Sequence, residues 1–155
     1  MSTSNIQATA IITGGFLSGA MMSLCFITVP TILDTATEAT HLQKQWARMY
    51  HYGHYILPTM AVGTGLLHGY TSLSKSRAQL PWRLFALAGV TVVSIAPFTW
   101  IFMLTTNNEL FRLGAQPLVP EMSRVRGLVV KWTWLHFARS LLTLTGTIMA
   151  AMGTF

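Results

Sequence analysis

The chain has 155 residues, of which 52% are hydrophobic and 9% are charged, with ten Lys and Arg against four Asp and Glu. A soluble domain carries roughly 25% charged residues, and the mean hydropathy of +0.49 also indicates that lipid is the solvent. The formal charge of +6 is expected to meet anionic lipid head groups, because no nucleic-acid-binding motif is present. Binding of nucleic acid is therefore not expected.

Four long apolar segments occupy most of the chain, at about residues 8–33, 53–73, 82–104 and 129–153. Each is close to the ~20 residues that a helix needs to cross ~30 Å of hydrocarbon. They predict an all-α fold, an integral membrane four-helix bundle of up-down topology that forms one domain over residues 1–155. The sequence thus favours a multi-pass membrane protein, and leaves its orientation, its compartment and any homo-oligomer open.

The connections differ in length and character. Residues 34–45 form a polar connection, and residues 42–55 read as an amphipathic helix whose aromatic rings suit the membrane interface. Residues 74–81 form a short basic connection, whereas residues 105–127 contain two Asn and two Pro and are expected to form a long third connection. In an up-down bundle the two long connections share one face of the membrane, and the termini share the other face with the short one.

Polar residues inside the fourth apolar segment are the first candidates for a functional site. Trp132, His136 and Arg139 are separated by four and three residues, so they share one face of a helix. An Arg within the membrane costs a few kcal/mol even on insertion scales, and it needs a carboxylate, a free carbonyl or a bound anion. A pair with Glu109, a side chain that extends to the membrane surface (snorkelling) and a ligand-binding role are all open.

A second group of candidates lies where the amphipathic helix meets the second segment. His51 and His54 are three residues apart and follow Tyr50. Pro58 lacks an N–H group, so the carbonyl of His54 loses its helical partner and becomes a possible hydrogen-bond acceptor. Histidines that simply face lipid head groups are the alternative.

The third group closes the third apolar segment. Asn107, Asn108 and Glu109 have the composition of a helix end and a turn, but the two amides could also donate hydrogen bonds to a developing oxyanion. A metal site could be assembled from the histidines and Glu109, but no HExxH motif, paired carboxylates or cysteine ligands accompany them. No metal ligand is therefore assigned, and bound metal stays open.

Four stretches carry a resemblance to a known family: Ser18-Gly-Ala-Met-Met-Ser23, Gln45-Trp-Ala-Arg-Met-Tyr-His-Tyr-Gly-His54, Thr106-Asn-Asn-Glu-Leu110 and Trp132-x-Trp-x-x-His136-x-x-Arg139. In this order and spacing they resemble the DUF1772 family, and within it the anthrone oxygenase-like branch of fungal aromatic polyketide pathways. The resemblance covers essentially the whole chain. It implies a membrane monooxygenase that converts an anthrone to an anthraquinone with O2 as co-substrate and without flavin or haem.

The chemistry of an anthrone suggests roles for the candidate residues. The methylene between two aryl rings is acidic, and its anion can itself reduce O2, so the protein needs a base, donors to the anion and an aromatic-lined pocket. His54 or His136 is expected to be the base, and Asn108 and Arg139 are expected to stabilise the anion. The expected substrate-binding residues are Tyr50, His51, Trp132, Trp134, Asn107 and Glu109.

Two other classes of function remain open. The chain could be a different membrane enzyme on the same scaffold, such as a cyclase, an isomerase or a metal-dependent oxidase. It could also be a non-catalytic membrane protein that binds lipid or holds partner enzymes. A lipophilic aromatic small molecule and the bilayer are the partners that the first interpretation predicts.

Overall fold

The computed structural model describes residues 3–154, and within that range every regular element is a helix. Residues 1, 2 and 155 of the predicted single domain lie outside the described residues. The elements, in chain order, are α1 (Thr3–Ser23), η1 (Leu24–Thr28), α2 (Val29–Thr35), α3 (Ala39–Arg77), α4 (Arg83–Val93), α5 (Ile95–Phe98), η2 (Thr99–Met103), α6 (Leu104–Ala115) and α7 (Met122–Met152). The predicted all-α class is confirmed.

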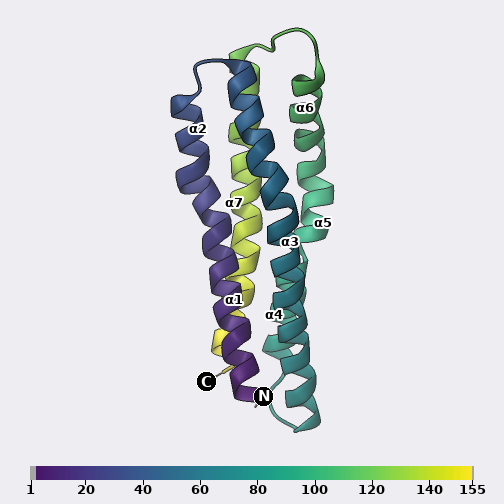
Figure 1. Cartoon of the computed structure of the whole chain (residues 1–155). Coiled ribbons are helices and arrows are strands. Elements are labelled where there is room, and N and C mark those ends of the chain that lie inside the picture. Colours follow the sequence, from purple (N-terminus) through teal and green to yellow (C-terminus); the bar gives the residue numbers. More distant parts are fainter. Residues whose placement is uncertain (1–2, 155) are drawn as a thin grey trace.

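The elements line up as four rods, because α1, η1 and α2 run end to end, as do α4, α5, η2 and α6. Figure 1 shows the four rods side by side, with residues 36–38 and 116–121 connecting them at one end. The connection between α3 and α4 lies at the other end, with both termini. In this arrangement each rod runs opposite to the next one in the chain.

Three of the predicted boundaries are wrong. The polar connection 34–45 is much shorter, because α2 extends to Thr35 and α3 begins at Ala39. The amphipathic segment 42–55 is not a separate helix, because α3 continues through it as one helix from Ala39 to Arg77. The predicted long connection 105–127 is helical over most of its length, and only residues 116–121 separate α6 from α7. Helix α6 forms because Leu110 and Leu113, three residues apart, bury their side chains against the bundle.

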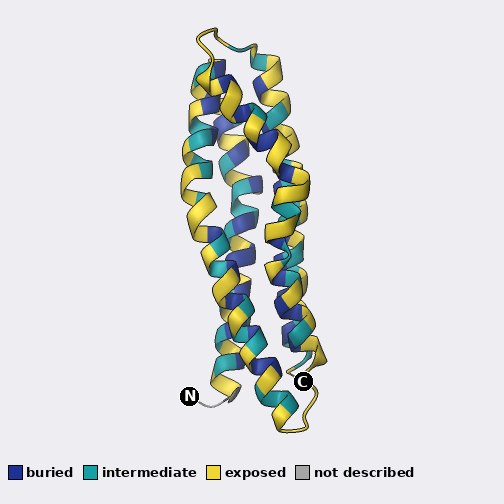
Figure 2. Ribbon diagram, turned by 90° about the vertical axis from the view of Figure 1, so that its right-hand side faces the viewer, coloured by how far each residue is buried: buried dark blue, intermediate teal, exposed yellow. Residues whose placement is uncertain are grey.

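Both apolar and polar side chains are buried between the rods, whereas large apolar side chains on all four rods are exposed. Figure 2 shows exposed positions, in yellow, along every rod. Two rods, Ser4–Thr35 and Arg83–Ala115, are long and apolar enough to cross a membrane. The surface that this protein presents is therefore suited to lipid.

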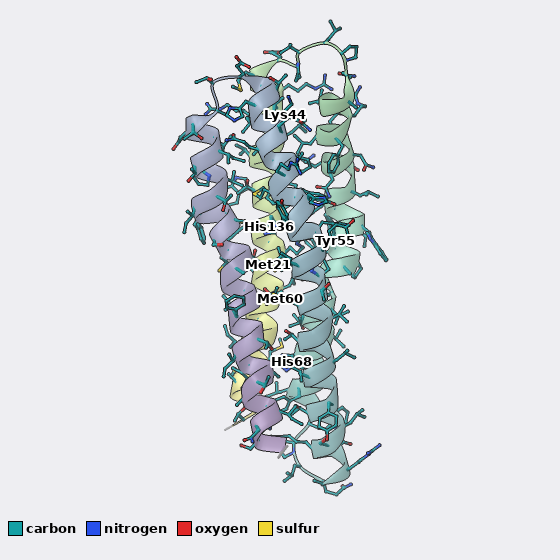
Figure 3. All side chains as sticks on the ribbon, viewed as in Figure 1. Met21, Lys44, Tyr55, Met60, His68 and His136 are labelled. Atoms are coloured by element: carbon teal, nitrogen blue, oxygen red, sulfur yellow. The ribbon has the colours of Figure 1, made fainter. Side chains whose placement is uncertain are left out.

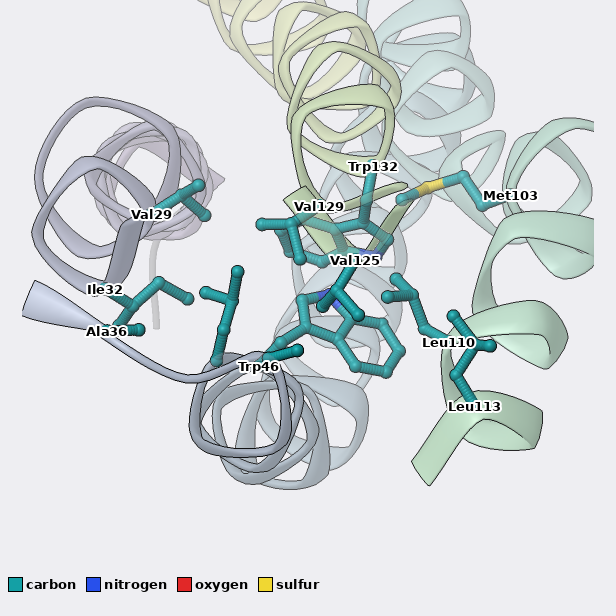
Figure 4. Close-up of a cluster of buried hydrophobic side chains, with 12 residues drawn as sticks. Val29, Ile32, Ala36, Trp46, Met103, Leu110, Leu113, Val125, Val129 and Trp132 are labelled. Atoms are coloured by element: carbon teal, nitrogen blue, oxygen red, sulfur yellow. The ribbon is translucent and has the colours of Figure 1, made fainter. Parts of the chain in front are cut away.

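The apolar core is layered along the bundle axis. The first layer lies at the end that carries residues 36–38 and 116–121, and Figure 4 shows how Trp46, Val129 and Trp132 meet Leu110 there. The second layer consists of Leu17, Met21, Leu57, Ala61, Val92 and Ile95. Between these two layers lie the polar side chains that form the candidate site.

A close contact between α4 and α7 yields a stability prediction. A Cβ atom added at Gly146 would lie 2.9 Å from the Ala88 carbonyl oxygen and 2.7 Å from Val92 Cγ2, whereas one added at Gly19 would meet nothing within 4 Å. Overpacking of this kind costs about 1–3 kcal/mol. We expect Gly146→Ala to unfold at a lower temperature than the wild type in detergent, as measured by circular dichroism. The control Gly19→Ala should not, and equal melting temperatures for the two variants would contradict the packing described.

Candidate functional site

A cavity of about 250 Å³ lies between the two apolar layers of the bundle. All four rods contribute to its wall, which consists of Leu24, Met49, Tyr50, Gly53, His54, Leu57, Pro58, Ile95, Ala96, Thr99, Trp100, Trp132, His136 and Arg139. Its volume is just below the ~300–1,000 Å³ of pockets for drug-sized ligands. The wall is mostly apolar and aromatic and carries one permanent charge, that of Arg139, so the cavity suits a compact aromatic ligand.

Arg139 is held by two neutral partners. Its Nη1 donates to Thr99 Oγ1 at 2.7 Å, and its Nη2 lies 2.8 Å from His136 Nδ1. Its Nε is buried and has no hydrogen-bond partner, and no carboxylate in residues 3–154 lies within ion-pair distance of the guanidinium. The charge of Arg139 is thus positioned beside the cavity without a counter-ion.

Thr99 is fixed in place from its own rod. Its hydroxyl donates to the Ile95 carbonyl at 2.7 Å, so its oxygen lone pairs are left to accept from Arg139. Thr99 is also the first residue of the π-helical turn η2, and turns of this kind are frequent at functional sites.

The contact with Arg139 defines the tautomer of His136. A guanidinium can only donate, so His136 Nδ1 must accept and the proton of the neutral ring is on Nε2. That Nε2 is buried and has no hydrogen-bond partner among the described residues. The ring is fully buried and stacks on Trp132 at 4.6 Å between centroids. His136 is therefore a fixed wall residue whose one lone pair is already occupied.

A second aromatic–histidine pair lies on α3, with the same four-residue spacing as Trp132 and His136 but with an exposed histidine. On α3, Tyr50 stacks on His54 at 5.3 Å between centroids, and Tyr55 packs edge-on against the same imidazole at 5.0 Å. Unlike His136, His54 is exposed at the rim of the cavity, and none of the hydrogen bonds of residues 3–154 involves its ring. One ring nitrogen of a neutral His54 is therefore available to a ligand.

The backbone is irregular at the level of the cavity in three of the four rods. The π-helical turn η1 includes Leu24, Pro58 interrupts the hydrogen-bond ladder of α3, and Ser94, Pro97 and η2 interrupt the third rod. Because proline has no N–H, Pro58 leaves the His54 carbonyl without its helical donor, and both residues line the cavity. Only α7, which carries His136 and Arg139, is regular here.

Five of the residues predicted for the site lie away from the cavity. Asn108 is exposed and, together with Glu109, borders a shallow hollow between α6 and α7, whereas Asn107 is buried. His51 packs against Tyr52 and Tyr55 on the outside of α3, and Trp134 is 69% exposed.

The pair of Glu109 with Arg139, one of the alternatives raised by the sequence, is not formed. Glu109 instead accepts hydrogen bonds from Arg112 and Arg124, and so ties α6 to the start of α7.

The cavity unites Tyr50, His54, Trp132, His136 and Arg139, all of which the sequence suggested. Sequence reasoning missed Thr99, the partner of Arg139, and the small wall residues Gly53 and Ala96. The signal that could have found Thr99 is its position two residues after Pro97, where a disturbed helix is expected. In residues 3–154 no three His, Cys, Asp or Glu side chains converge as metal ligands would.

The anchoring of Arg139 can be tested by removing the hydroxyl that holds it. Thr99→Val keeps the shape of the side chain but leaves Nη1 without an acceptor, and hydrogen bonds to charged groups contribute about 1.5–3 kcal/mol. We expect Thr99→Val to lower the melting temperature in detergent, and Thr99→Ser, which keeps the hydroxyl, to retain most of the stability. A Val variant as stable as the Ser variant would show that the contact does not hold Arg139.

Comparison with known proteins assigns the chain to a family. Residues 46–149 match the family described as anthrone oxygenase. The chain is 55% identical to the anthrone oxygenase AgnL2 of Paecilomyces divaricatus over 99% of this chain and 97% of that one. It is 46% identical to the anthrone oxygenase tpcL of Aspergillus fumigatus, over 92% and 89% of the two chains.

A third relative carries a different name. The chain is 39% identical to the noranthrone monooxygenase of Aspergillus flavus, over 93% of this chain and 70% of that one. No solved structure matches the chain. These matches confirm the resemblance seen in the four sequence stretches, and the chain belongs to the anthrone oxygenase family.

Proposed function

We propose that the protein is a membrane-embedded, cofactor-independent oxygenase that converts an anthrone-like polycyclic phenol to a quinone with O2 in an aromatic polyketide pathway. The relatives named anthrone oxygenase support the reaction class. The observation that carries the proposal is the guanidinium of Arg139, which lies at an aromatic-lined cavity with only neutral partners. A buried cation of this kind favours an anionic ligand.

We further propose that all four rods cross the bilayer, with residues 3–154 as one transmembrane domain. Two rods meet the length and apolarity of a span. The remaining two helices, α3 and α7, support the same placement because they also expose large apolar side chains along their length, such as Leu66 and Tyr70 on α3 and Leu141 and Ile148 on α7. Such a surface is unfavourable in water.

The reaction balances without a further reductant. A base removes one proton from the anthrone methylene, and the resulting anion gives one electron to O2. The carbon radical and superoxide then combine into a peroxide anion at that carbon, which takes back the first proton from the base. The second methylene hydrogen then leaves as a proton, the O–O bond breaks, and the departing hydroxide combines with this proton. The products are the quinone carbonyl and one molecule of water, so both oxygen atoms and all four electrons are accounted for.

The geometry favours a division of roles between the two histidines. His136 is a poor base because its lone pair already faces Arg139. His54 has no such partner and lines the same cavity, so it is the proposed base. A positioned base of this type contributes about 10²–10⁴-fold to the rate.

The proposed donors to the anion are Arg139 and Trp132. The buried Nε of Arg139 and the buried indole Nε1 of Trp132 both lack a hydrogen-bond partner, and both residues line the cavity. Each could donate to the oxygen on which the negative charge develops, with an effect that is large in a water-poor site. Asn108, suggested for this role by the sequence, is outside the cavity, so we do not assign it here.

Substitution of the histidines tests this division of roles. We expect His54→Ala to lower kcat about 10²-fold or more, because the proton of the methylene loses its acceptor, and to leave KM nearly unchanged. The exposed His41, which is outside the cavity, serves as the control in His41→Ala. Oxygen uptake by the purified protein with a hydroxylated anthrone measures the rate, against a control without enzyme because anthrones autoxidise. Full activity in His54→Ala, or in a His54→Ala, His136→Ala double variant, would contradict the assignment of His54 as the base.

Removal of metal tests the absence of a cofactor. We expect protein purified with a chelator to consume one O2 for each quinone formed at the same rate as untreated protein, because the substrate anion itself supplies the electrons. A rate that falls to the background and returns on addition of a divalent transition metal would support a metal-dependent oxidase instead.

A further inference from the structure

The wall of the cavity is exposed on one side only. Its deep residues, such as Leu57, Ile95 and His136, are at most 6% exposed. In contrast, His54 on α3 and Ala96 and Trp100 on the third rod are exposed. The opening of the cavity therefore lies between α3 and the α5–η2 segment, which Figure 1 shows next to each other near the middle of the bundle.

The opening lies near the middle of the third rod, far from both of the ends of the rod that would face water. Trp100 is 17 residues from Arg83 and 15 residues from Ala115, the ends of an apolar rod suited to cross a membrane. At ~1.5 Å per residue it is about 25 Å and about 22 Å from these ends. Figure 3 shows Tyr55, which packs against His54, at about the level of His136 in the middle of the bundle.

The surface around the opening is apolar. Tyr55 and Ile56 on one side and Ile101 and Phe102 on the other are all more than half exposed. Side chains of this kind at this level contact hydrocarbon in the bilayer. A planar, uncharged phenol dissolved in the hydrocarbon would meet the opening without crossing a polar layer.

We propose that this opening is a lateral portal through which the aromatic substrate passes directly between the bilayer hydrocarbon and the cavity, with Trp100 as the residue that limits its size. The indole of Trp100 is 72% exposed and yet lines the cavity, so it lies at the boundary between the two. The inference rests on the proposed function for the identity of the substrate. Beyond the proposed function, it assigns the route by which the substrate enters the cavity and the residue that determines which ring substituents can pass.

Trp100 is well suited to this role because it is large and sits in an irregular helical turn. The η2 segment lacks regular α-helical hydrogen bonds from Thr99 to Met103. Directly across the opening, α3 contributes Gly53, which has no side chain, and Pro58. The width of the portal therefore depends mainly on the residues of the third rod, Ala96 and Trp100.

Substitutions at the portal should change the selection of substrates. We expect Trp100→Ala to raise kcat/KM for an anthrone with a bulky ring substituent about tenfold relative to an unsubstituted tricyclic anthrone, in line with steric effects in apolar pockets of ~10–200-fold. The matched control is Ile101→Ala, because Ile101 is the next residue, is 70% exposed and does not line the cavity. Ala96→Phe should lower kcat/KM for both substrates. An unchanged substrate ratio in Trp100→Ala would overturn the assignment of Trp100.

A second measurement does not depend on turnover. Wild-type protein in phosphatidylcholine vesicles is irradiated with membrane-dissolved 4-hydroxybenzophenone, and labelled residues are identified by mass spectrometry. We expect saturable labelling around His54, Ala96 and Trp100. Labelling concentrated at the hollow bordered by Asn108 and Lys131 would overturn the portal, because it would indicate access from the end of the bundle.

The two measurements separate the portal from the proposed function. If the wild type labels at the portal but oxidises no anthrone, the proposed reaction is wrong and the portal stands for another lipophilic aromatic ligand. If the wild type oxidises anthrones and labels only at the end of the bundle, the reaction stands and the portal is wrong.

Discussion

A guanidinium without a counter-ion, held inside a bundle that is suited to lipid, is the constraint on which the site depends. A charge in this environment is costly, and Arg139 is tolerated because Thr99 and His136 each accept one of its hydrogen bonds. These partners orient the cation but do not neutralise it. The anion of a bound phenol can serve as the counter-ion of Arg139. The buried charge, which is costly in the empty cavity, therefore favours the ionised form of the ligand.

The same contacts connect the rods that form the cavity. Arg139 on α7 is joined to Thr99 in the third rod, while Trp46 on α3 packs edge-on against Trp132 on α7 at 6.2 Å between centroids. The irregular turns in three rods lie at the level of the cavity, because Leu24 of η1, Pro58 of α3 and Thr99 of η2 all line it.

The sequence predicted those parts of the site that lie on a regular helix. The spacing of Trp132, His136 and Arg139 was sufficient because α7 keeps its period throughout. The third rod was not predictable in this way, since Pro97 and η2 change the rotation of everything that follows. Asn107 and Asn108, whose composition is typical of a turn, instead lie within α6. Of the two side chains, Asn107 is buried and Asn108 is exposed. The four apolar segments correctly predicted the number of rods, but the ends of the rods depend on tertiary contacts, such as the packing of Leu110 in the apolar layer that contains Trp46 and Trp132.

The most direct test of the account is the absorption spectrum of a hydroxylated anthrone bound to the detergent-purified protein without O2. Anaerobic conditions stop the reaction before electron transfer, so the ionisation state of the ligand can be observed alone. We expect the spectrum of the anthrone anion at a pH where the free compound is neutral, and we expect Arg139→Gln to bind the neutral form. A neutral ligand in the wild-type cavity would contradict the claim that Arg139 stabilises the anion from which the reaction with O2 begins.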